Sequence, residues 1–181
     1  MEIKAGNFYK VLAPRPTVII TTIDKNGNVN AAPFSFVMPV SMNPALVAFA
    51  SGHGKHTLGN VRETKEFVVN IPPEKILKKL LITAENFPKG VNELEKAGLT
   101  EKKSKLVKPP CIEECIAWFE CELEFEKTAG DHVIVVGRVV NAEIADGFMK
   151  ENGNLDVKKA KPLLHLGGNE FAVPERIIES K

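Results

Sequence analysis

The sequence predicts a mainly β fold with peripheral helices, built as a small antiparallel β-barrel. Segments that are rich in β-branched residues, or that alternate apolar and polar residues, recur along the chain. Short turns typical of hairpins join several of them. The regular succession of strand, helix and strand that characterises a parallel sheet is missing. With 181 residues and no linker or internal repeat, the chain is expected to form one domain over residues 1–181.

The clearest local prediction is a hairpin near the N-terminus. Thr17–Ile23 reads TVIITTI, a β-branched run typical of a strand. Asn26-Gly27 follows, and both residues accept the positive φ that a two-residue hairpin turn requires. The return strand is expected over Asn28–Val37. Because Pro33 has no N–H to donate to a neighbouring strand, we expect it at a sheet edge or a bulge.

The next segments alternate between a turn, two strands and a short helix. Pro39 and Pro44 are expected to bracket a turn, and Ala45–Ala50 reads as a buried strand. His56–Glu63 is compatible with a short helix, and Lys65–Ile71 is the next predicted strand. The sequence therefore predicts a glycine-containing turn that connects a buried strand to a helix.

Two segments of opposite character occupy the middle of the chain. Glu74–Ala84 has apolar residues at helical spacing, after two prolines that end the preceding strand. Asn86–Pro110 is polar, rich in lysine and irregular, apart from a short helix expected at Asn92–Lys96. We interpret it as a solvated excursion over the barrel surface, at about residues 86–110. A lid over a ligand is the alternative interpretation.

A second hairpin is expected in the C-terminal half. Ile116–Lys127 alternates two faces, and the glutamates of Glu120–Glu126 are expected on the solvated one. Ala129–Asp131 forms the turn, and His132–Ile144 returns as a strand. Gly137, inside this strand, indicates a bulge or a close approach of another group to the backbone.

Composition excludes several classes of partner. Lys and Arg number 24 against 23 Asp and Glu, a formal charge of +1. This balance gives no basis for binding nucleic acid or an anionic membrane surface. No apolar run is long enough to span a bilayer, and the N-terminal segment lacks the apolar region of a signal peptide. With an odd count of three cysteines, we expect reduced thiols and a cytoplasmic location.

The segment Ser51–Thr57, SGHGKHT, is the most suggestive for function. Its glycines allow close approach of a ligand, and the following helix would present unpaired N–H groups at its start. The hydroxyls of Ser51 and Thr57 and the ammonium of Lys55 are donors suited to a phosphate. The pattern is not GxxxxGK[ST], which disfavours a nucleoside triphosphatase. A plain turn with Thr57 as the helix N-cap remains the alternative.

A second candidate site lies in Asn30–Met38, where Pro33 distorts the strand. Phe34 and Ser35 beside that distortion would suit a flat heteroaromatic ligand, which needs an apolar slot with a few polar partners. The alternative is an edge strand whose phenylalanines fill the core.

The histidines and cysteines show no metal pattern. His132 opens a strand after a turn, where a side chain can reach the barrel rim, and His165 is expected in a glycine-containing loop. Cys111 and Cys115 form a C-x₃-C pair without a second pair, which is too few ligands for a zinc site. The sequence therefore predicts no metal site.

Taken together, five segments resemble one family. Four are RPTVIITTID, NVNAAPFSFVMPVSMNPALVAFA, KHTLGNVRETKEFVVNIP and AGDHVIVVGRV, and the fifth is PLLHLGGNEF. In this order they resemble the flavin reductase-like, FMN-binding split-barrel family, with flavoredoxin-type proteins as the nearest branch. The resemblance extends from about Tyr9 to Val173. It implies an antiparallel split β-barrel that forms a homodimer, with FMN bound non-covalently near the interface.

The resemblance also implies roles for individual residues. Positions that match the phosphate contacts of the family are Ser51, Lys55 and Thr57. Positions that match the lining of the isoalloxazine ring are Ala32, Pro33, Phe34 and Ser35. Secondary contacts are expected from Asn30, His56 and Arg15. His132 matches a catalytic position near the reactive side of the flavin, and His165 matches a C-terminal loop that reaches the flavin of the partner subunit.

The function that the resemblance implies is an FMN-dependent oxidoreductase. It would pass electrons from NAD(P)H to flavin, ferric complexes or a redox partner protein. The alternative is a flavoredoxin-type electron carrier that holds FMN without NAD(P)H activity of its own. Because the chain has no GxGxxG motif, NAD(P)H is expected to bind only transiently, over the flavin.

Overall fold

A computed structural model describes residues 1–180 of the chain. The strands are β1 (Arg15–Pro16), β2 (Val18–Ile23), β3 (Val29–Phe34), β4 (Val37–Met42), β5 (Ala45–Gly52), β6 (Glu66–Ile71), β7 (Glu101–Lys102), β8 (Cys111–Ile112), β9 (Ala117–Ala129), β10 (His132–Ile144), β11 (Leu164–Gly167) and β12 (Glu170–Ala172). The helices are α1 (Phe8–Val11), α2 (His56–Thr64), α3 (Leu77–Thr83), α4 (Glu93–Ala97) and α5 (Val157–Ala160), with 3₁₀ turns at Ala5–Asn7 and Glu74–Ile76.

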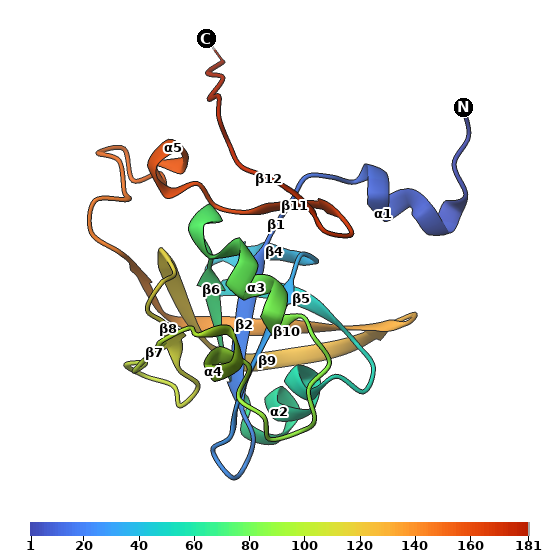
Figure 1. Cartoon of the computed structure of the whole chain (residues 1–181), viewed down its shortest axis with the longest axis vertical. Coiled ribbons are helices and arrows are strands. Elements are labelled where there is room, and N and C mark those ends of the chain that lie inside the picture. The colour runs from blue at the N-terminus through green and yellow to red at the C-terminus, as the bar shows by residue number, and fades with distance from the viewer. Residues whose placement is uncertain (181) are drawn as a thin grey trace.

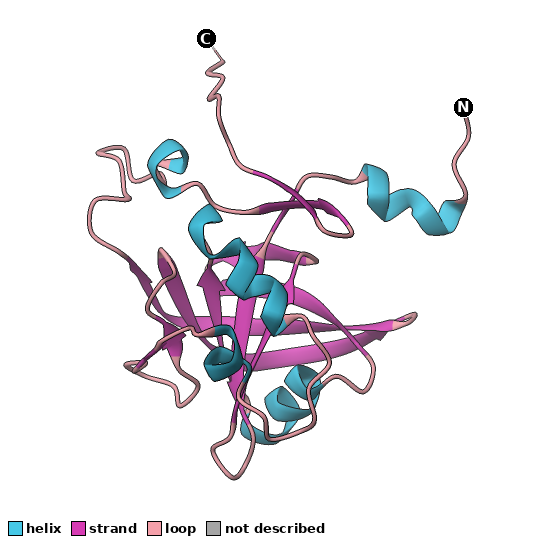
Figure 2. Ribbon diagram, in the orientation of Figure 1, coloured by secondary structure: helices cyan, strands magenta, loops and turns pink. Residues whose placement is uncertain are grey.

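Seven strands form one antiparallel sheet in the order β3-β2-β6-β9-β10-β5-β4. The sheet curls until β3 and β5 approach each other, and helices lie outside it (Figures 1 and 2). A small sheet, β1-β11-β12, lies beside the chain ends, and β7 pairs with β8. The prediction of a mainly antiparallel β fold with peripheral helices is confirmed.

Strand β2 is buried on both faces, which explains its unbroken β-branched sequence. Val18 and Ile20 face the core inside the curled sheet, with Phe49 and Phe67. Ile19 faces a second core, between the sheet and α3 and α4. Two apolar layers therefore hold the sheet from opposite sides.

The predicted return strand Asn28–Val37 is wrong at its end. Strand β3 stops at Phe34, and Val37 begins β4, which pairs with β5 instead of β2. The turn expected between Pro39 and Pro44 is also misplaced, because Pro39 lies inside β4 and the turn is confined to residues 43–44. The edge position of Pro33 is confirmed, since β3 ends the sheet.

The long β9–β10 hairpin confirms the second predicted hairpin and the role of Gly137. The register with β9 shifts between Val136 and Gly137. A Cβ atom at Gly137 would lie 2.3 Å from the Cζ atom of Phe67, so no larger residue fits without moving that ring. Both expected features, a bulge and a close approach, are present.

Residues 86–110 run over the sheet, but the segment is only partly solvated, which corrects its interpretation as a solvated excursion. The helix α4 and the following turn bury Leu94, Ala97 and Leu99 in the second core, and Val107 joins them. Although many of its other residues are polar, this segment contributes apolar side chains at the spacing of one helical turn. It covers one face of the sheet.

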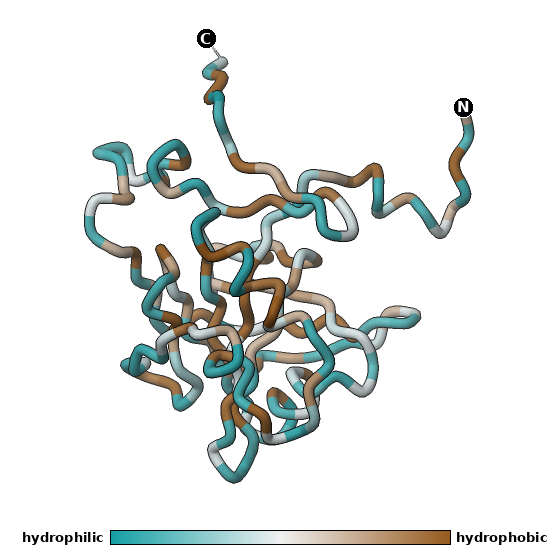
Figure 3. Tube along the Cα trace, in the orientation of Figure 1, coloured by the Kyte–Doolittle hydropathy of each residue, from teal (hydrophilic) through white to brown (hydrophobic). Residues whose placement is uncertain are grey.

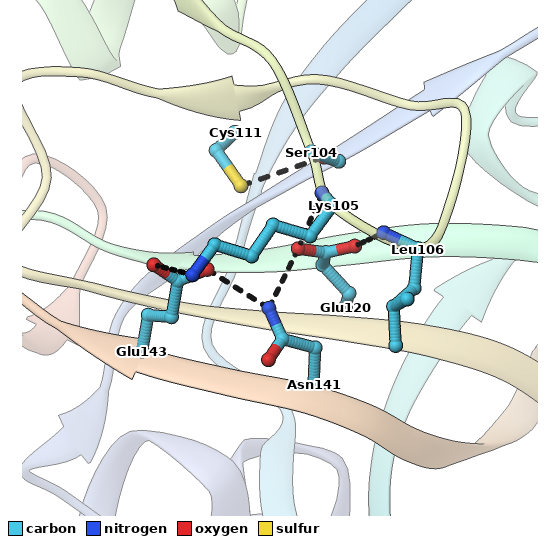
Figure 4. Close-up of polar contacts among 7 residues, drawn as sticks. All are labelled: Ser104, Lys105, Leu106, Cys111, Glu120, Asn141 and Glu143. Atoms are coloured by element: carbon cyan, nitrogen blue, oxygen red, sulfur yellow. Dashed lines mark hydrogen bonds and ion pairs between the residues drawn. The ribbon is translucent and has the colours of Figure 1, made fainter.

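The glutamate face of β9 is not uniformly solvated either. Glu120 is 1% exposed, and its carboxylate accepts hydrogen bonds from the backbone N–H groups of Lys105, Leu106 and Val107 at 2.6–3.1 Å. Figure 4 shows the bonds from Lys105 and Leu106. Asn141 on β10 donates a further bond at 2.8 Å. A single carboxylate thus fastens the loop before β8 to the sheet.

The N-terminal strand β1 and the C-terminal hairpin β11–β12 form the small sheet together. β1 pairs with β11, so that Arg15 lies opposite His165. His165 therefore lies in strand β11, and the expectation from the sequence that it lies in a loop is wrong. The guanidinium of Arg15 donates to the carbonyls of Tyr9 and Leu166, one on each side. Arg15 thereby ties the N-terminal segment to the C-terminal hairpin.

The surface carries apolar side chains along the N-terminal segment and one edge of the sheet. Phe8, Met38 and Met42 are exposed, and Figure 3 shows apolar and polar stretches mixed along the projecting N-terminal segment. Among residues 1–180, no helix is long and apolar enough to cross a membrane.

Candidate functional site

A cavity of about 550 Å³ opens between β3, the start of α2 and the end of α3. It gathers most of the predicted site residues, although they come from distant parts of the chain. The predicted residues that line it are Arg15, Asn30, Ala32, Pro33, Phe34, Ser35, Lys55, His56, Thr57, His132 and His165.

Ser51 is the predicted residue that the structure does not bring to the cavity. Its side chain is fully buried, and its hydroxyl lies 3.3 Å from the carbonyl oxygen of Gly52. Ser51 alternates with Ala50 and Gly52 along β5, and those two residues line the cavity in its place.

The start of α2 forms a polar end of the cavity. Lys55 precedes the helix in an extended conformation, and the N–H groups of the first turn lie beside it. Thr57 lies within the helix and is not its N-cap, so the alternative interpretation of a simple cap is wrong. The helix N-terminus and the Lys55 ammonium together favour an anion.

The Thr57 hydroxyl is oriented by a buried hydrogen-bond chain. Asn30 on β3 donates from Nδ2 to the Thr57 Oγ1 atom at 3.1 Å. The same amide lies 3.4 Å from the hydroxyl of Thr22, which also accepts from Asn60 at 3.1 Å. Because Thr57 accepts from Asn30, its own proton remains available to donate to a ligand.

The outer edge of β3 forms an apolar strip along the cavity. The Ala31 N–H points away from β2 and donates to a carboxylate of α4. By strand periodicity, Pro33 faces the same way, so its missing N–H costs no ladder bond. Phe34 contacts Phe49 edge to face, with ring centroids 4.9 Å apart. Phe34 therefore lines the cavity and also packs on the core, which combines the two interpretations of this segment.

A polar network closes the far end of this strip. The Arg15 guanidinium lies 3.3 Å from His165 Nδ1, and because arginine only donates, Nδ1 accepts. His165 Nε2 then donates to the Gly168 carbonyl at 3.0 Å. The Ser35 hydroxyl lies 3.0 Å from the same Nδ1 atom and completes this network. The buried Arg15 Nε atom has no partner among residues 1–180.

His132 lies on the cavity wall beside Phe36, with ring centroids 5.6 Å apart. Its Nδ1 atom is 2.8 Å from Asp131, and this hydrogen bond lowers the pKa of the Asp131 carboxyl. The side chain of His132 is about one-third exposed, so a second molecule entering the cavity can reach it.

One wall of the cavity includes part of the segment for which the sequence offered a lid over a ligand as the alternative interpretation. Thr83 at the end of α3, residues 84–87 after it, and Glu93, the first residue of α4, line the cavity. Glu93 is 5% exposed, accepts from the Ala31 N–H at 2.9 Å, and has a pKa raised by burial. No sequence motif identifies Glu93 as a site residue, because its position at the cavity depends on how α4 packs against β3.

The thiols of Cys111 and Cys115 take no part in the site. Both are buried and free, neither lines the cavity, and burial raises the pKa of each. Their surroundings suit small apolar side chains in the second core.

Comparisons with known proteins agree with this geometry. The flavin reductase-like domain matches residues 11–173. An uncharacterized protein of Aquifex aeolicus is 39% identical over 179 residues, which cover 94% of this chain and 91% of that protein. Nitrilotriacetate monooxygenase component B from Bacillus cereus is 30% identical, with a TM-score of 0.88 over 99% of this chain and 95% of that one.

A flavoredoxin from Methanosarcina acetivorans shares the fold, with a TM-score of 0.86 at 23% identity over 99% of this chain and 94% of that one. A flavin reductase with a split barrel domain from Shewanella frigidimarina also shares the fold, with a TM-score of 0.90 at 18% identity over 99% of this chain and 93% of that one, which confirms the split-barrel fold expected from the sequence. The match over residues 11–173 covers most of the chain, and the chain belongs to the flavin reductase-like family.

Proposed function

We propose that the cavity binds FMN non-covalently and that the chain is an FMN-dependent oxidoreductase. The observation that carries the proposal is the union, in one cavity, of an anion-binding end at Lys55 and Thr57 with an apolar strip at Ala32–Phe34. A flavin mononucleotide needs both, because it joins a phosphate to a flat heteroaromatic ring.

The donors present fit this cofactor. Lys55 supplies a cation, Thr57 a free hydroxyl proton, and the first turn of α2 backbone N–H groups for the phosphate. Ala32 and Pro33 offer small apolar surfaces on which a ring can lie close to the backbone. At the far end, Ser35 and the Arg15 guanidinium supply polar partners for the ring edge.

When bound, FMN supplies the redox chemistry, accepting a hydride or single electrons. The residues of the chain orient it, exclude water and adjust its charge. Arg15 places a buried positive charge at the cavity wall, which favours the more electron-rich form of a bound ring. Phe34 and Phe36 provide apolar surface that limits access of water.

We further propose that NAD(P)H is the electron donor and that flavin, a ferric complex or a redox partner protein is the acceptor. His132 would contact the donor, because it is partly exposed at the cavity wall and stacks beside Phe36. The test is anaerobic addition of NADH or NADPH to the FMN-loaded chain, with loss of flavin absorbance followed by stopped flow. We expect rapid bleaching with one of them, and slower bleaching in His132→Ala at unchanged FMN affinity.

A chain that holds FMN but is bleached by neither nucleotide would contradict the reductase and favour the flavoredoxin-type carrier. Equal bleaching rates in His132→Ala and the wild type would remove the role of His132. His53→Ala is the matched control, because His53 contacts the carbonyl of Gly130 in the turn that precedes His132 but does not line the cavity.

We also propose that the functional unit is a homodimer. Met38, Val40 and Met42 on the edge strand β4 are exposed, as are Phe8 and Leu12 in the N-terminal segment. Such a patch on a small protein is typical of an interface. Because Tyr9 and Phe36 connect this patch to the cavity mouth, a second copy there would cover the bound cofactor.

A further inference from the structure

Glu93 is a buried carboxylate that the proposed function does not use. It opens α4, where the side chain of Asn92 caps the helix by accepting from the Leu94 N–H. Its carboxylate reaches across to the edge of β3 and accepts from the Ala31 N–H at 2.9 Å. Only 5% of the surface of Glu93 is exposed, and the residue lines the cavity.

The hydrogen bonds within the protein do not use all the acceptor sites of the Glu93 carboxylate. An ionised carboxylate offers about four acceptor sites. Burial dominates and raises the pKa of the group, although the Ala31 N–H, the N–H of Glu93 itself and the nearby imidazole of His56 each act to lower it. In the described part of the chain, His56 forms no hydrogen bond or ion pair with the carboxylate. No Lys or Arg forms an ion pair with it among residues 1–180. A glutamine would satisfy Ala31 at a lower desolvation cost, so the second oxygen calls for a donor from the cavity.

The position of Glu93 along the strand indicates which part of a ligand it faces. Ala31 directly follows Asn30, whose amide binds Thr57 at the anion end of the cavity. The end of the strand at Phe34 lies three residues farther on, about 10 Å along the strand, and Ser35 and the Arg15 network lie beyond it. Glu93 therefore flanks the part of the cavity next to the phosphate end and well before the ring end.

We propose that Glu93 is a ligand-binding residue that accepts a hydrogen bond from a hydroxyl group of the ribityl chain of the flavin. The proposal rests on FMN binding in this cavity. In FMN, the polyol chain joins the phosphate to the ring, and its hydroxyls are neutral donors. A carboxylate so close to a phosphate is tolerable when it faces such donors, and unfavourable when it faces the phosphate itself.

The test measures binding of FMN, riboflavin and lumiflavin to the wild type and to Glu93→Gln by quenching of flavin fluorescence. Riboflavin lacks the phosphate, and lumiflavin lacks the chain but keeps the ring. Glutamine keeps an oxygen for the Ala31 N–H, so the thermal unfolding of the ligand-free variant should match that of the wild type. Glu95→Gln is the control, because it removes the same charge from the exposed side of the same helix.

We expect Glu93→Gln to weaken the binding of FMN and of riboflavin by the same factor, about tenfold, because a charged acceptor is replaced by a neutral one. Lumiflavin should bind both proteins equally. Tighter binding of FMN with unchanged binding of riboflavin would show that Glu93 only repels the phosphate. Equally weakened binding of lumiflavin would show that Glu93 contacts the ring. Either result, or no change in any ligand, overturns the proposal. Failure of the wild type to bind any of the three would instead refute the FMN site.

Discussion

At the scale of single residues, the anion end of the cavity depends on two side chains from one turn. Lys55 contributes the charge, and Thr57 contributes a hydroxyl whose proton is freed by Asn30. We expect Lys55→Ala or Thr57→Ala to weaken FMN binding by about 1.5–3 kcal/mol, or about 10- to 150-fold in Kd. Isothermal titration of FMN into the ligand-free chain measures this loss.

Riboflavin is the matched control ligand, because it lacks the phosphate that these residues would hold. Both variants should bind riboflavin as the wild type does, and the exposed variant Lys25→Ala should bind both ligands normally. An unchanged FMN affinity in Lys55→Ala and Thr57→Ala would refute the assignment of the phosphate end.

At the scale of elements, the loop before β8 is held by the buried carboxylate of Glu120. Burial alone would raise the pKa of this group, but the hydrogen bonds from Lys105, Leu106 and Asn141 lower it below the ordinary 4.5. A lowered pKa in the folded state means that the stabilisation is present above the unfolded-state pKa and is lost as the pH falls through the folded-state pKa. The free energy of unfolding should therefore drop as the medium is acidified below about pH 4.5.

We expect Glu120→Gln to lower the free energy of unfolding at pH 7 by about 2–3 kcal/mol, because the amide offers fewer acceptors to three backbone donors. Its stability should also depend less on pH in the acid range. Urea unfolding at pH 7 and pH 4 measures both effects. Glu122→Gln, exposed on the same strand, is the control and should change neither. A Glu120→Gln variant with the pH dependence of the wild type would contradict this role of the loop anchor.

The elements expected from the sequence can be compared with those in the structure. The N-terminal hairpin, α2 and the β9–β10 hairpin follow from local patterns, and all three are present. The expected two-residue turn at Asn26-Gly27 is wrong, because the first hairpin turns over residues 24–28 and Gly27, but not Asn26, has a positive φ. Glu120 looked like part of an exposed alternating face, because the sequence does not show that a distant loop folds over it. Glu93 and residues 83–87 were not predicted as site residues for the same reason, since only tertiary packing brings them to the cavity, although a lid at residues 86–110 was the alternative interpretation.

At the scale of the whole molecule, the exposed apolar edge predicts self-association. We expect the wild type to sediment at twice the mass of one chain, and Val40→Lys together with Met42→Lys to shift it towards the monomer. A charge buried in an apolar interface without a partner is strongly unfavourable. Leu106→Lys, at an exposed apolar residue outside this edge, should leave the dimer intact. A monomeric wild type would contradict the proposal.

The central claim is that one cavity holds one FMN. The most direct measurement incubates the purified chain with excess FMN, removes free flavin by gel filtration, and records the visible absorbance spectrum. The account predicts a yellow protein with about one FMN per chain, and a clear loss of bound flavin in Thr57→Ala. A colourless wild-type protein after the same treatment would contradict it.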